Sequence, residues 1–140
     1  MIKRKLFSVI AFLLVLSFCF SGCAVVIEDN APAKGEQQEI RLGKGEKQFL
    51  LTVTNDKGEE AAYRINTDKS TVGEALLELK IIEGEEGPYG MYIKTVNGLT
   101  ADFNDGGKYW AFYVNGEYAT AGVDKTVVEN NFVYSLKVQK

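Results

Sequence analysis

Residues 109–123, "YWAFYVNGEYATAGV", constrain the fold more than any other part of the chain. Two runs flank Asn115-Gly116, and an Asn-Gly pair between alternating apolar runs is typical of a β-hairpin with a two-residue turn. Alternate side chains of a strand point to opposite sides of a sheet. The two sides of the first strand would carry Tyr109, Ala111 and Tyr113, and Trp110, Phe112 and Val114. Both sides are apolar, although a hairpin in a small domain needs only one apolar face. We therefore expect the second face to have a contact outside the core.

The remaining pattern predicts an α+β fold. Strand-like runs rich in β-branched and aromatic residues are separated by turn-rich segments. These runs are 49–55, 61–67, 91–96, 109–114 and 132–138, with a helix after the second. One amphipathic helix can cover one face of one sheet. We expect a single β-grasp-like domain over residues 47–140, with one helix packed on a mixed sheet of about five or six strands.

The predicted helix has a recognisable start. Thr71 and Glu74 stand three residues apart, as in a capping box that satisfies two backbone N–H groups at a helix N-terminus. Apolar residues then recur on one face of a 3.6-residue period. They are Val72, Ala75, Leu76, Leu79 and Ile82. The helix would end at Glu83 and Gly84, and "EGEEGPYG" (83–90) would form a loop.

Residues 1–22 resemble an export signal. Three basic residues, at positions 3–5, precede an almost unbroken apolar run over 6–18, which is short for a membrane span. The run leads into "FSGC" (20–23), which resembles the site at which bacterial lipoprotein signals are cleaved before a cysteine. We expect a lipoprotein signal peptide over 1–22 and a lipid-bearing Cys23 as the new N-terminus. The alternative is an ordinary secretory signal followed by a stray cysteine.

Cysteine use and charge agree with a lipid anchor. Of the two cysteines, Cys19 would leave with the signal, so Cys23 could form no internal disulfide. Several acyl chains on Cys23 would attach the protein stably to a membrane. Residues 23–46 are polar and lack an apolar period, which predicts a flexible tether, although "EIRL" (39–42) could form a short strand. The signal carries three of the 16 basic residues and none of the 19 acidic ones, so its loss changes the net charge from −3 to −6. This acidic balance argues against nucleic acid as a partner.

Signatures of catalysis and metal binding are nearly absent. The chain has no histidine, which removes the commonest general base and most zinc sites. No phosphate-binding or dinucleotide-binding glycine motif is present. Residues 102–113 superficially resemble a calcium loop, but Gly106 stands at the fifth position, where a ligand is required, and Tyr113 occupies the twelfth position. We expect no catalytic residue and no metal site, and therefore a protein that is not an enzyme.

Three motifs resemble the C-terminal β domain of the vitamin B12 carriers transcobalamin and intrinsic factor, above all its stand-alone bacterial members. They are the strand that ends in Asn97-Gly98, the Tyr109-Trp110-x-Phe112 motif, and Gly122-Val123 following Ala111 by eleven residues. The resemblance covers residues 47–140. It implies a domain that closes over one face of a corrin ring through apolar contacts.

The resemblance also implies site residues. By position, ligand contacts fall on Ile93, Phe112 and Ala119, with Trp110 as a motif residue that walls the pocket. We add Tyr118, an aromatic residue of the same hairpin whose hydroxyl suits a partly wet surface. If Tyr109, Ala111 and Tyr113 form the core face, Phe112 is free to meet the ligand. The chain shows no counterpart of the helical domain that holds the other face of the ring in the animal carriers.

The expected protein is an extracytoplasmic binding lipoprotein on the outer face of a bacterial cell membrane, with no covalent group apart from the lipid. A corrinoid such as cobalamin is the first expected ligand, and another small apolar ligand stays open. The alternative is a protein-interaction module that docks a surface protein or a transporter subunit. A concave pocket at Phe112 would favour a ligand, whereas a flat exposed patch would favour a protein.

The lipid anchor is tested by Cys23→Ser. Without the thiol no lipid can be attached, so the variant should leave the membrane fraction or stay unprocessed. Cell fractionation followed by mass measurement checks both outcomes. A variant that remains in membranes at the normal mature size would contradict the lipoprotein reading.

Overall fold

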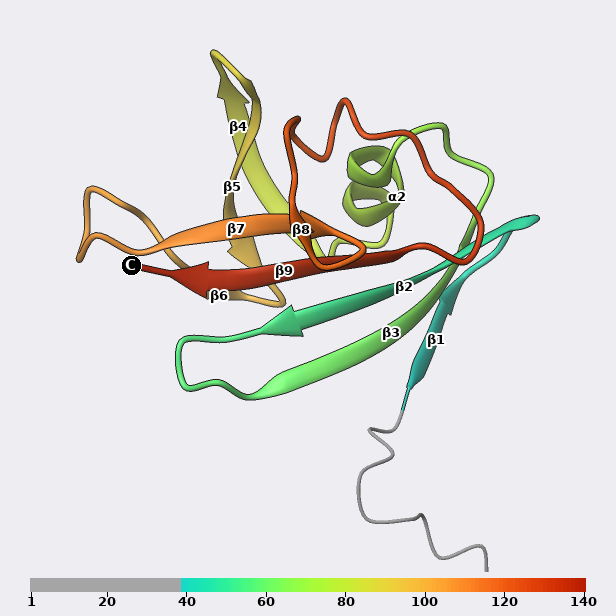
Figure 1. The fold of residues 1–140 in the computed structure, drawn as a ribbon, viewed down its shortest axis with the longest axis horizontal. Helices are drawn as coiled ribbons and strands as arrows, with labels where there is room; N and C mark the ends of the chain where they lie inside the picture. The colour runs from blue at the N-terminus through green and yellow to red at the C-terminus, as the bar shows by residue number, and fades with distance from the viewer. Residues whose placement is uncertain (1–38) are drawn as a thin grey trace, which may run out of the picture. The chain divides into compact units, whose positions relative to one another are not determined.

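The computed structural model describes residues 39–140, which form one α-helix and nine β-strands in two sheets (Figure 1). The large sheet has the spatial order β1 Ile40–Gly43, β3 Glu60–Thr67, β2 Lys47–Thr54, β9 Val133–Gln139, β7 Tyr109–Val114 and β8 Glu117–Tyr118. It is mixed, because β1–β3 and β2–β9 are parallel pairs and the others are antiparallel. The small antiparallel sheet consists of β4 Ile82–Gly87, β5 Gly90–Val96 and β6 Leu99–Thr100.

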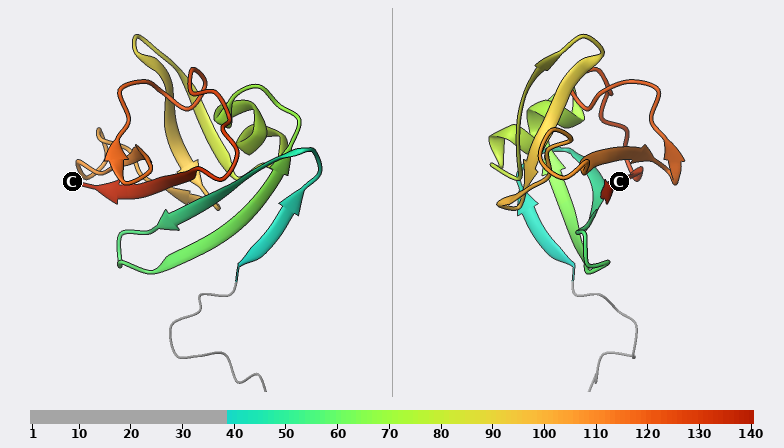
Figure 2. Two further views of the ribbon diagram at one scale, coloured as in Figure 1. Left: turned by 45° about the vertical axis from the view of Figure 1, so that its right-hand side comes forward. Right: turned by 90° about the vertical axis from the view of Figure 1, so that its left-hand side faces the viewer.

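The helix α2 (Val72–Glu78) stands beside the β4–β5 hairpin, and both lie on one side of the long strands β2 and β9 (Figures 1 and 2). A single hydrophobic core joins the helix and the two sheets. Its fully buried members include Phe49, Leu51, Ile65, Leu76, Ile82, Val96, Tyr134 and Leu136. The period-2 burial of β2 follows from the alternation of side chains along a strand, and in β3 the same alternation buries Ile65 and Thr67.

The α+β class is confirmed, but the predicted single sheet of five or six strands is too simple. The segment expected to be a loop, "EGEEGPYG", supplies most of β4 and the turn into β5. Four residues of β4, Glu83 to Glu86, are exposed, so no apolar alternation marks the strand. Backbone pairing with β5 holds it in place, and a register shift between Glu83 and Gly84 interrupts the ladder.

The folded region also starts earlier than the predicted boundary at residue 47. β1 lies within the segment expected to be a tether, and it pairs in parallel with Tyr63–Asn66 of β3. Glu39 adds a bidentate ion pair with Arg64, at 2.8 Å. The export signal and Cys23 lie outside the described residues. Within residues 39–140, no helix is long and apolar enough to cross a membrane.

The expectation that Tyr109, Ala111 and Tyr113 form the core face of β7 and leave Phe112 free is wrong. In the antiparallel β7–β9 pair, Phe112 lies opposite Leu136, and directly paired residues share a face. Leu136 is fully buried, and Phe112 is 8% and Trp110 6% exposed. Phe112 therefore belongs to the core. The outer face carries Tyr113, whose ring lies 5.5 Å from Lys137 Nζ and 5.3 Å from the ring of Tyr118.

The capping box of the helix is confirmed. Thr71 Oγ1 accepts a hydrogen bond from Glu74 N at 3.2 Å, and Glu74 Oε2 accepts one from Thr71 N at 3.2 Å. The helix ends at Glu78, one turn before the predicted end, because Lys80 takes a left-handed conformation with φ 56°. Ile82 is buried as expected, but as the first residue of β4.

The helix register is tested by two truncations. Thr71→Ala removes an N-cap and should lower the free energy of unfolding by about 0.5–2 kcal/mol. Leu76→Ala opens a cavity in the core and should cost more, about 2–5 kcal/mol. Thr71→Ser keeps the capping oxygen and serves as the control. Urea melts that rank Thr71→Ala as the most damaging variant would contradict the register.

Candidate functional site: a cleft beside the β7–β8 hairpin

A cleft with a volume of about 190 Å³ lies between the tip of the β4–β5 hairpin and the segment that follows β8. We call it the aromatic cleft. It is lined by Tyr89, Trp110, Phe112, Tyr118, Ala119, Thr120, Ala121 and Gly122. None of these side chains is charged at neutral pH, and their polar atoms are hydroxyls and an indole nitrogen. The lining therefore combines aromatic rings with hydrogen-bonding groups, and it suits a flat ligand that also carries polar atoms.

Four of the five residues expected to bind a ligand line this cleft: Trp110, Phe112, Tyr118 and Ala119. The fifth, Ile93, is 5% exposed and lies in the hydrophobic core on β5. Phe112 stacks on Tyr134, with ring centroids 6.0 Å apart, and only 8% of it is exposed, so it offers the cleft little surface. Tyr118, which is 60% exposed, offers the cleft far more surface.

The Asn-Gly turn sets the geometry of the hairpin. Asn115 and Gly116 both have positive φ, 49° and 85°, as a tight two-residue turn requires. Two pairs, Tyr113 with Tyr118 and Val114 with Glu117, close the hairpin. Ala119 N then donates a hydrogen bond of 3.0 Å to Phe112 O. This bond holds Ala119 beside the Phe112 backbone and places the following residues over the mouth of the cleft.

Asp124 joins the two walls of the aromatic cleft. Its Oδ1 accepts a hydrogen bond from Met91 N, 2.8 Å away, at the start of β5. Gly90 and Gly122 flank the carboxylate closely, because a Cβ at either position would lie only 2.7 Å or 2.6 Å from Asp124 Oδ1. A side chain at either position would therefore displace the Asp124 carboxylate from its hydrogen bond with Met91 N, and Gly90 also has a φ of 111°, which favours glycine. Asp124 is therefore a positioning residue that fixes Tyr89 opposite Tyr118.

The loop that contains Asp124 is also tied to the helix. Gly73 N donates to Val123 O at 2.8 Å, and Val72 N donates to Thr126 O at 2.9 Å. These bonds satisfy backbone N–H groups of the first helical turn, which have no partner within the helix. These two hydrogen bonds therefore attach the loop that follows the cleft wall to the N-terminus of the helix.

A second cavity, about 350 Å³ in volume, shares Tyr118, Ala119, Thr120 and Ala121 with the aromatic cleft. It is completed by Val114, Asn115, Glu117 and Thr126. Residues 118–121 therefore form a ridge between two hollows. Partial burial raises the pKa of Tyr118, and the neighbouring Tyr109 and Tyr113 raise it further. The Tyr118 hydroxyl consequently stays protonated and neutral well above pH 7.

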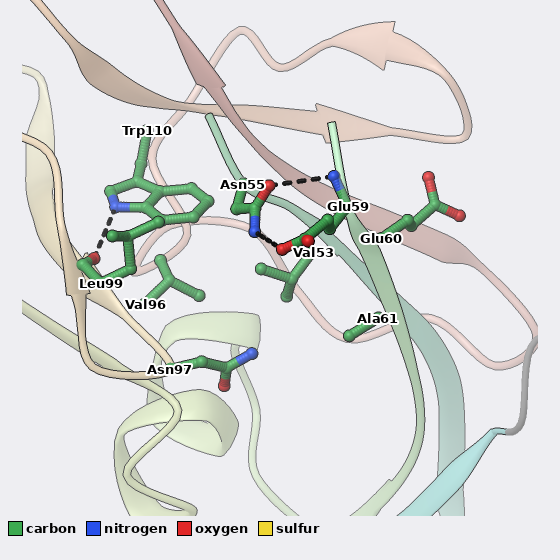
Figure 3. Close-up of a pocket in the computed structure, with 9 residues that line it drawn as sticks. All are labelled: Val53, Asn55, Glu59, Glu60, Ala61, Val96, Asn97, Leu99 and Trp110. Atoms are coloured by element: carbon green, nitrogen blue, oxygen red, sulfur yellow. Dashed lines mark hydrogen bonds between the residues drawn. The ribbon is translucent and has the colours of Figure 1, made fainter. Parts of the chain in front are cut away.

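Trp110 is also one wall of a third cavity, with a volume of about 250 Å³ (Figure 3). We call it the acidic cavity, because Glu59 and Glu60 are among its lining residues. The indole is held by a hydrogen bond of 3.2 Å from Trp110 Nε1 to Leu99 O. Trp110 thus lies between two hollows that differ in charge: the acidic cavity is lined by two glutamates, and the aromatic cleft by no charged residue.

No metal centre is found in the described part of the chain, where no three acidic or cysteine residues gather as ligands would. In the segment that superficially resembles a calcium loop, Asp102 Oδ1 accepts a hydrogen bond from Asn104 N at 2.9 Å. Its other oxygen lies 3.7 Å from Lys94 Nζ. The Asp102 carboxylate is therefore engaged in a turn and an ion pair.

Sequence reasoning missed several residues of the cleft: Tyr89, Thr120, Ala121, Gly122 and the positioning residue Asp124. The segment "ATAGVD" directly follows the predicted hairpin, and its small residues indicate a close approach of another chain segment. No local pattern links it to Tyr89, because that contact depends on a hydrogen bond between residues 33 positions apart.

Comparison with known proteins places the chain among related folds. The model of a domain of unknown function, DUF4430, matches residues 69–134. A protein of Ruminococcus gnavus proposed to bind a metal is 29% identical, with a TM-score of 0.64 over 68% of this chain and 98% of its own. Haptocorrin in complex with the corrinoid Cbi is 22% identical, with a TM-score of 0.53 over 67% of this chain. The match covers 25% of the haptocorrin chain. No curated protein matches the sequence.

These similarities support the resemblance to the transcobalamin group at the level of fold. Haptocorrin belongs to that group, and the part of it that matches is about the size of one domain. The similarity to the Ruminococcus gnavus protein extends over nearly all of that chain, so a stand-alone domain of this fold exists.

The two hairpin aromatics should differ sharply in their contribution to stability. Phe112→Ala removes a core ring stacked on Tyr134 and should lower the free energy of unfolding by about 3–5 kcal/mol. Tyr118→Ala removes a ring that is 60% exposed and should cost less than about 1.5 kcal/mol, chiefly its contact with Tyr113. Thermal and urea melts of the two variants check the order. Equal losses would contradict the assignment of Phe112 to the core.

Proposed function

We propose that this chain is a binding protein whose aromatic cleft receives one face of a flat, largely apolar ligand, with a corrinoid as the first candidate. The observation that carries the proposal is the convergence of Trp110, Phe112, Tyr118 and Ala119 on one uncharged cleft. The shared fold with haptocorrin, which is found in complex with a corrinoid, supports the choice of ligand.

The shape of the site suits partial enclosure. The ridge formed by residues 118–121 has a hollow on each side, and the exposed rings of Tyr89 and Tyr118 stand at the rim. A macrocycle resting on this ridge would bury one face and leave the other in water. Because affinity rises with the apolar surface removed from water, one covered face gives weaker binding than a fully enclosed site. We propose micromolar binding by this domain alone, and tighter binding when a second protein covers the other face.

The proposed location of the protein is the outer face of a bacterial membrane, and its proposed role is binding without catalysis. The export signal and Cys23 would anchor the protein by lipid to the outer face of a bacterial membrane, with the binding domain in the extracytoplasmic space. The cleft is lined by no carboxylate, lysine or cysteine, which supports a binding role in place of an enzymatic one.

A second candidate function is the docking of a protein, such as a surface protein or a transporter subunit. Tyr89 favours it, because its side chain is 92% exposed at the tip of the β4–β5 hairpin. Tyrosine is enriched at protein interfaces, where a rigid ring contributes contact area at a low entropic cost. Saturable binding of a small corrinoid would favour the first candidate, and its absence the second.

The proposal is tested by titrating the mature chain with cobinamide, followed by visible absorbance and calorimetry. Tyr118→Ala should weaken binding about threefold to thirtyfold, since it removes a partly buried ring contact. Ala119→Arg should abolish binding, because a long charged side chain would project from the ridge into the space that the ligand occupies.

Leu77→Arg is the matched control for the arginine substitution. Leu77 is exposed on α2, away from the cleft, so this variant should bind like the unchanged protein. An absence of cobinamide binding up to millimolar concentration, or equal binding by all three variants, would contradict the proposal.

A further inference from the structure

The acidic cavity is a framed hollow whose walls are tied together. The turn between β2 and β3 contributes Asn55 and Glu59, and the start of β3 contributes Glu60. An ion pair of 2.8 Å between Lys108 and Asp56 ties this turn to the start of β7. The opposite wall, the β5–β6 turn, is tied to β7 by the Trp110 Nε1 hydrogen bond to Leu99 O. Three segments distant in the sequence are therefore held at a fixed spacing around the cavity.

The floor of this cavity is apolar and largely inaccessible. Val53, Val96 and Trp110 are 5%, 0% and 6% exposed, and Ala61 completes the floor. Figure 3 shows the indole of Trp110 and the side chains of Val53 and Val96 facing the same hollow. Such a floor suits the hydrocarbon part of a ligand.

The polar atoms of the rim are chiefly hydrogen-bond acceptors. Asn55 Nδ2 donates to Glu59 Oε2 at 2.7 Å, and Asn97 Nδ2 donates to Tyr63 Oη at 2.9 Å. Trp110 Nε1 is used by Leu99 O. Each of these nitrogens already makes one hydrogen bond and each amide keeps a second N–H, whereas an ionised carboxylate has about four acceptor sites. The rim therefore calls for a ligand that donates hydrogen bonds.

Charge selects the same class of ligand. In the described part of the chain, no lysine or arginine lines the acidic cavity. Lys108, at its edge, is paired with Asp56, and its hydrogen bond lowers the pKa of that carboxyl group. No ion pair within residues 39–140 involves Glu59 or Glu60. The Glu59 carboxylate at the mouth attracts a cation and repels an anion. The Glu60 carboxylate points away from the cavity, because it accepts a hydrogen bond of 3.4 Å from Thr54 Oγ1 on the other face of the β2–β3 pair.

We propose that the acidic cavity is a second binding site, for a small organic cation with a primary ammonium group on a short apolar body. The apolar body would lie on Val53, Ala61 and the indole of Trp110, and the ammonium group would donate hydrogen bonds to Glu59 at the rim. This site is separate from the aromatic cleft, with which it shares only the Trp110 side chain. Its ligand differs from a corrinoid in both size and charge.

The experiment uses three probes of one skeleton with different charge: 2-phenylethylamine, 2-phenylethanol and 3-phenylpropionate. Trp110 is the only tryptophan of the chain, so its fluorescence, excited at a wavelength that the probes do not absorb, reports directly on the cavity wall. The amine should change the signal saturably. The alcohol should bind about tenfold more weakly, and the carboxylate should not bind at the same concentrations.

Two variants locate the site. Glu59→Gln keeps an oxygen that can accept the Asn55 hydrogen bond but removes the charge, and it should weaken amine binding about threefold to tenfold. Glu83→Gln removes a carboxylate from an exposed position on β4 and should leave binding unchanged. Tyr118→Ala, in the aromatic cleft, should also leave it unchanged.

Three results would overturn the inference. The first is an amine titration without saturation, and the second is equal binding of amine and alcohol. The third is a loss of amine binding in Tyr118→Ala with none in Glu59→Gln, which would assign the amine to the aromatic cleft. Cobinamide binding is measured separately, so either site can fail without the other.

Discussion

Tyr134 is the contact on which the arrangement of the domain depends. The residue is completely buried on β9, between β2 and β7, where its ring lies 5.1 Å from Phe49 and 6.0 Å from Phe112. Its hydroxyl group donates a hydrogen bond to Val127 O at 3.1 Å and accepts one from Glu129 N at 3.0 Å. An unpaired buried hydroxyl is costly, so these two bonds fix the position of the loop as firmly as the ring fixes the sheet. One side chain thus couples the packing of the core to the loop that leads away from the binding cleft.

The cleft depends on this coupling because its walls come from segments that are far apart in the sequence. The loop held by Tyr134 contains Asp124, and Asp124 in turn holds the β4–β5 hairpin through Met91 N. Glycine at positions 90 and 122 leaves room for the Asp124 carboxylate in this contact. The ring of Tyr89 therefore stands over the cleft through a chain of contacts that begins in the hydrophobic core. The aromatic cleft is thus formed as a consequence of core packing, although few of its own residues are buried.

Local signals were sufficient for much of the fold. The Asn115-Gly116 turn and the Thr71 capping box are encoded by neighbouring residues, and the structure contains both. Non-local contacts decided the rest. β4 carries four exposed residues and exists because it pairs with β5, so hydrophobic alternation could not reveal it. Likewise, both faces of β7 are apolar, and only pairing with Leu136 determines that Phe112 faces the core. The four cleft residues came from the resemblance and from aromatic crowding, and Asp124 carries no local signal.

The central claim is that a flat apolar ligand rests on the ridge of residues 118–121. The most direct test is an amide NMR titration of the ¹⁵N-labelled mature chain with cobinamide. The account predicts shifts that saturate together at residues 118–122, at 110–112 and at the hairpin tip around Tyr89. The turn at residues 55–61, which borders the acidic cavity, should stay unchanged. Saturable shifts confined to that turn, or no shifts along the ridge at millimolar cobinamide, would contradict the claim.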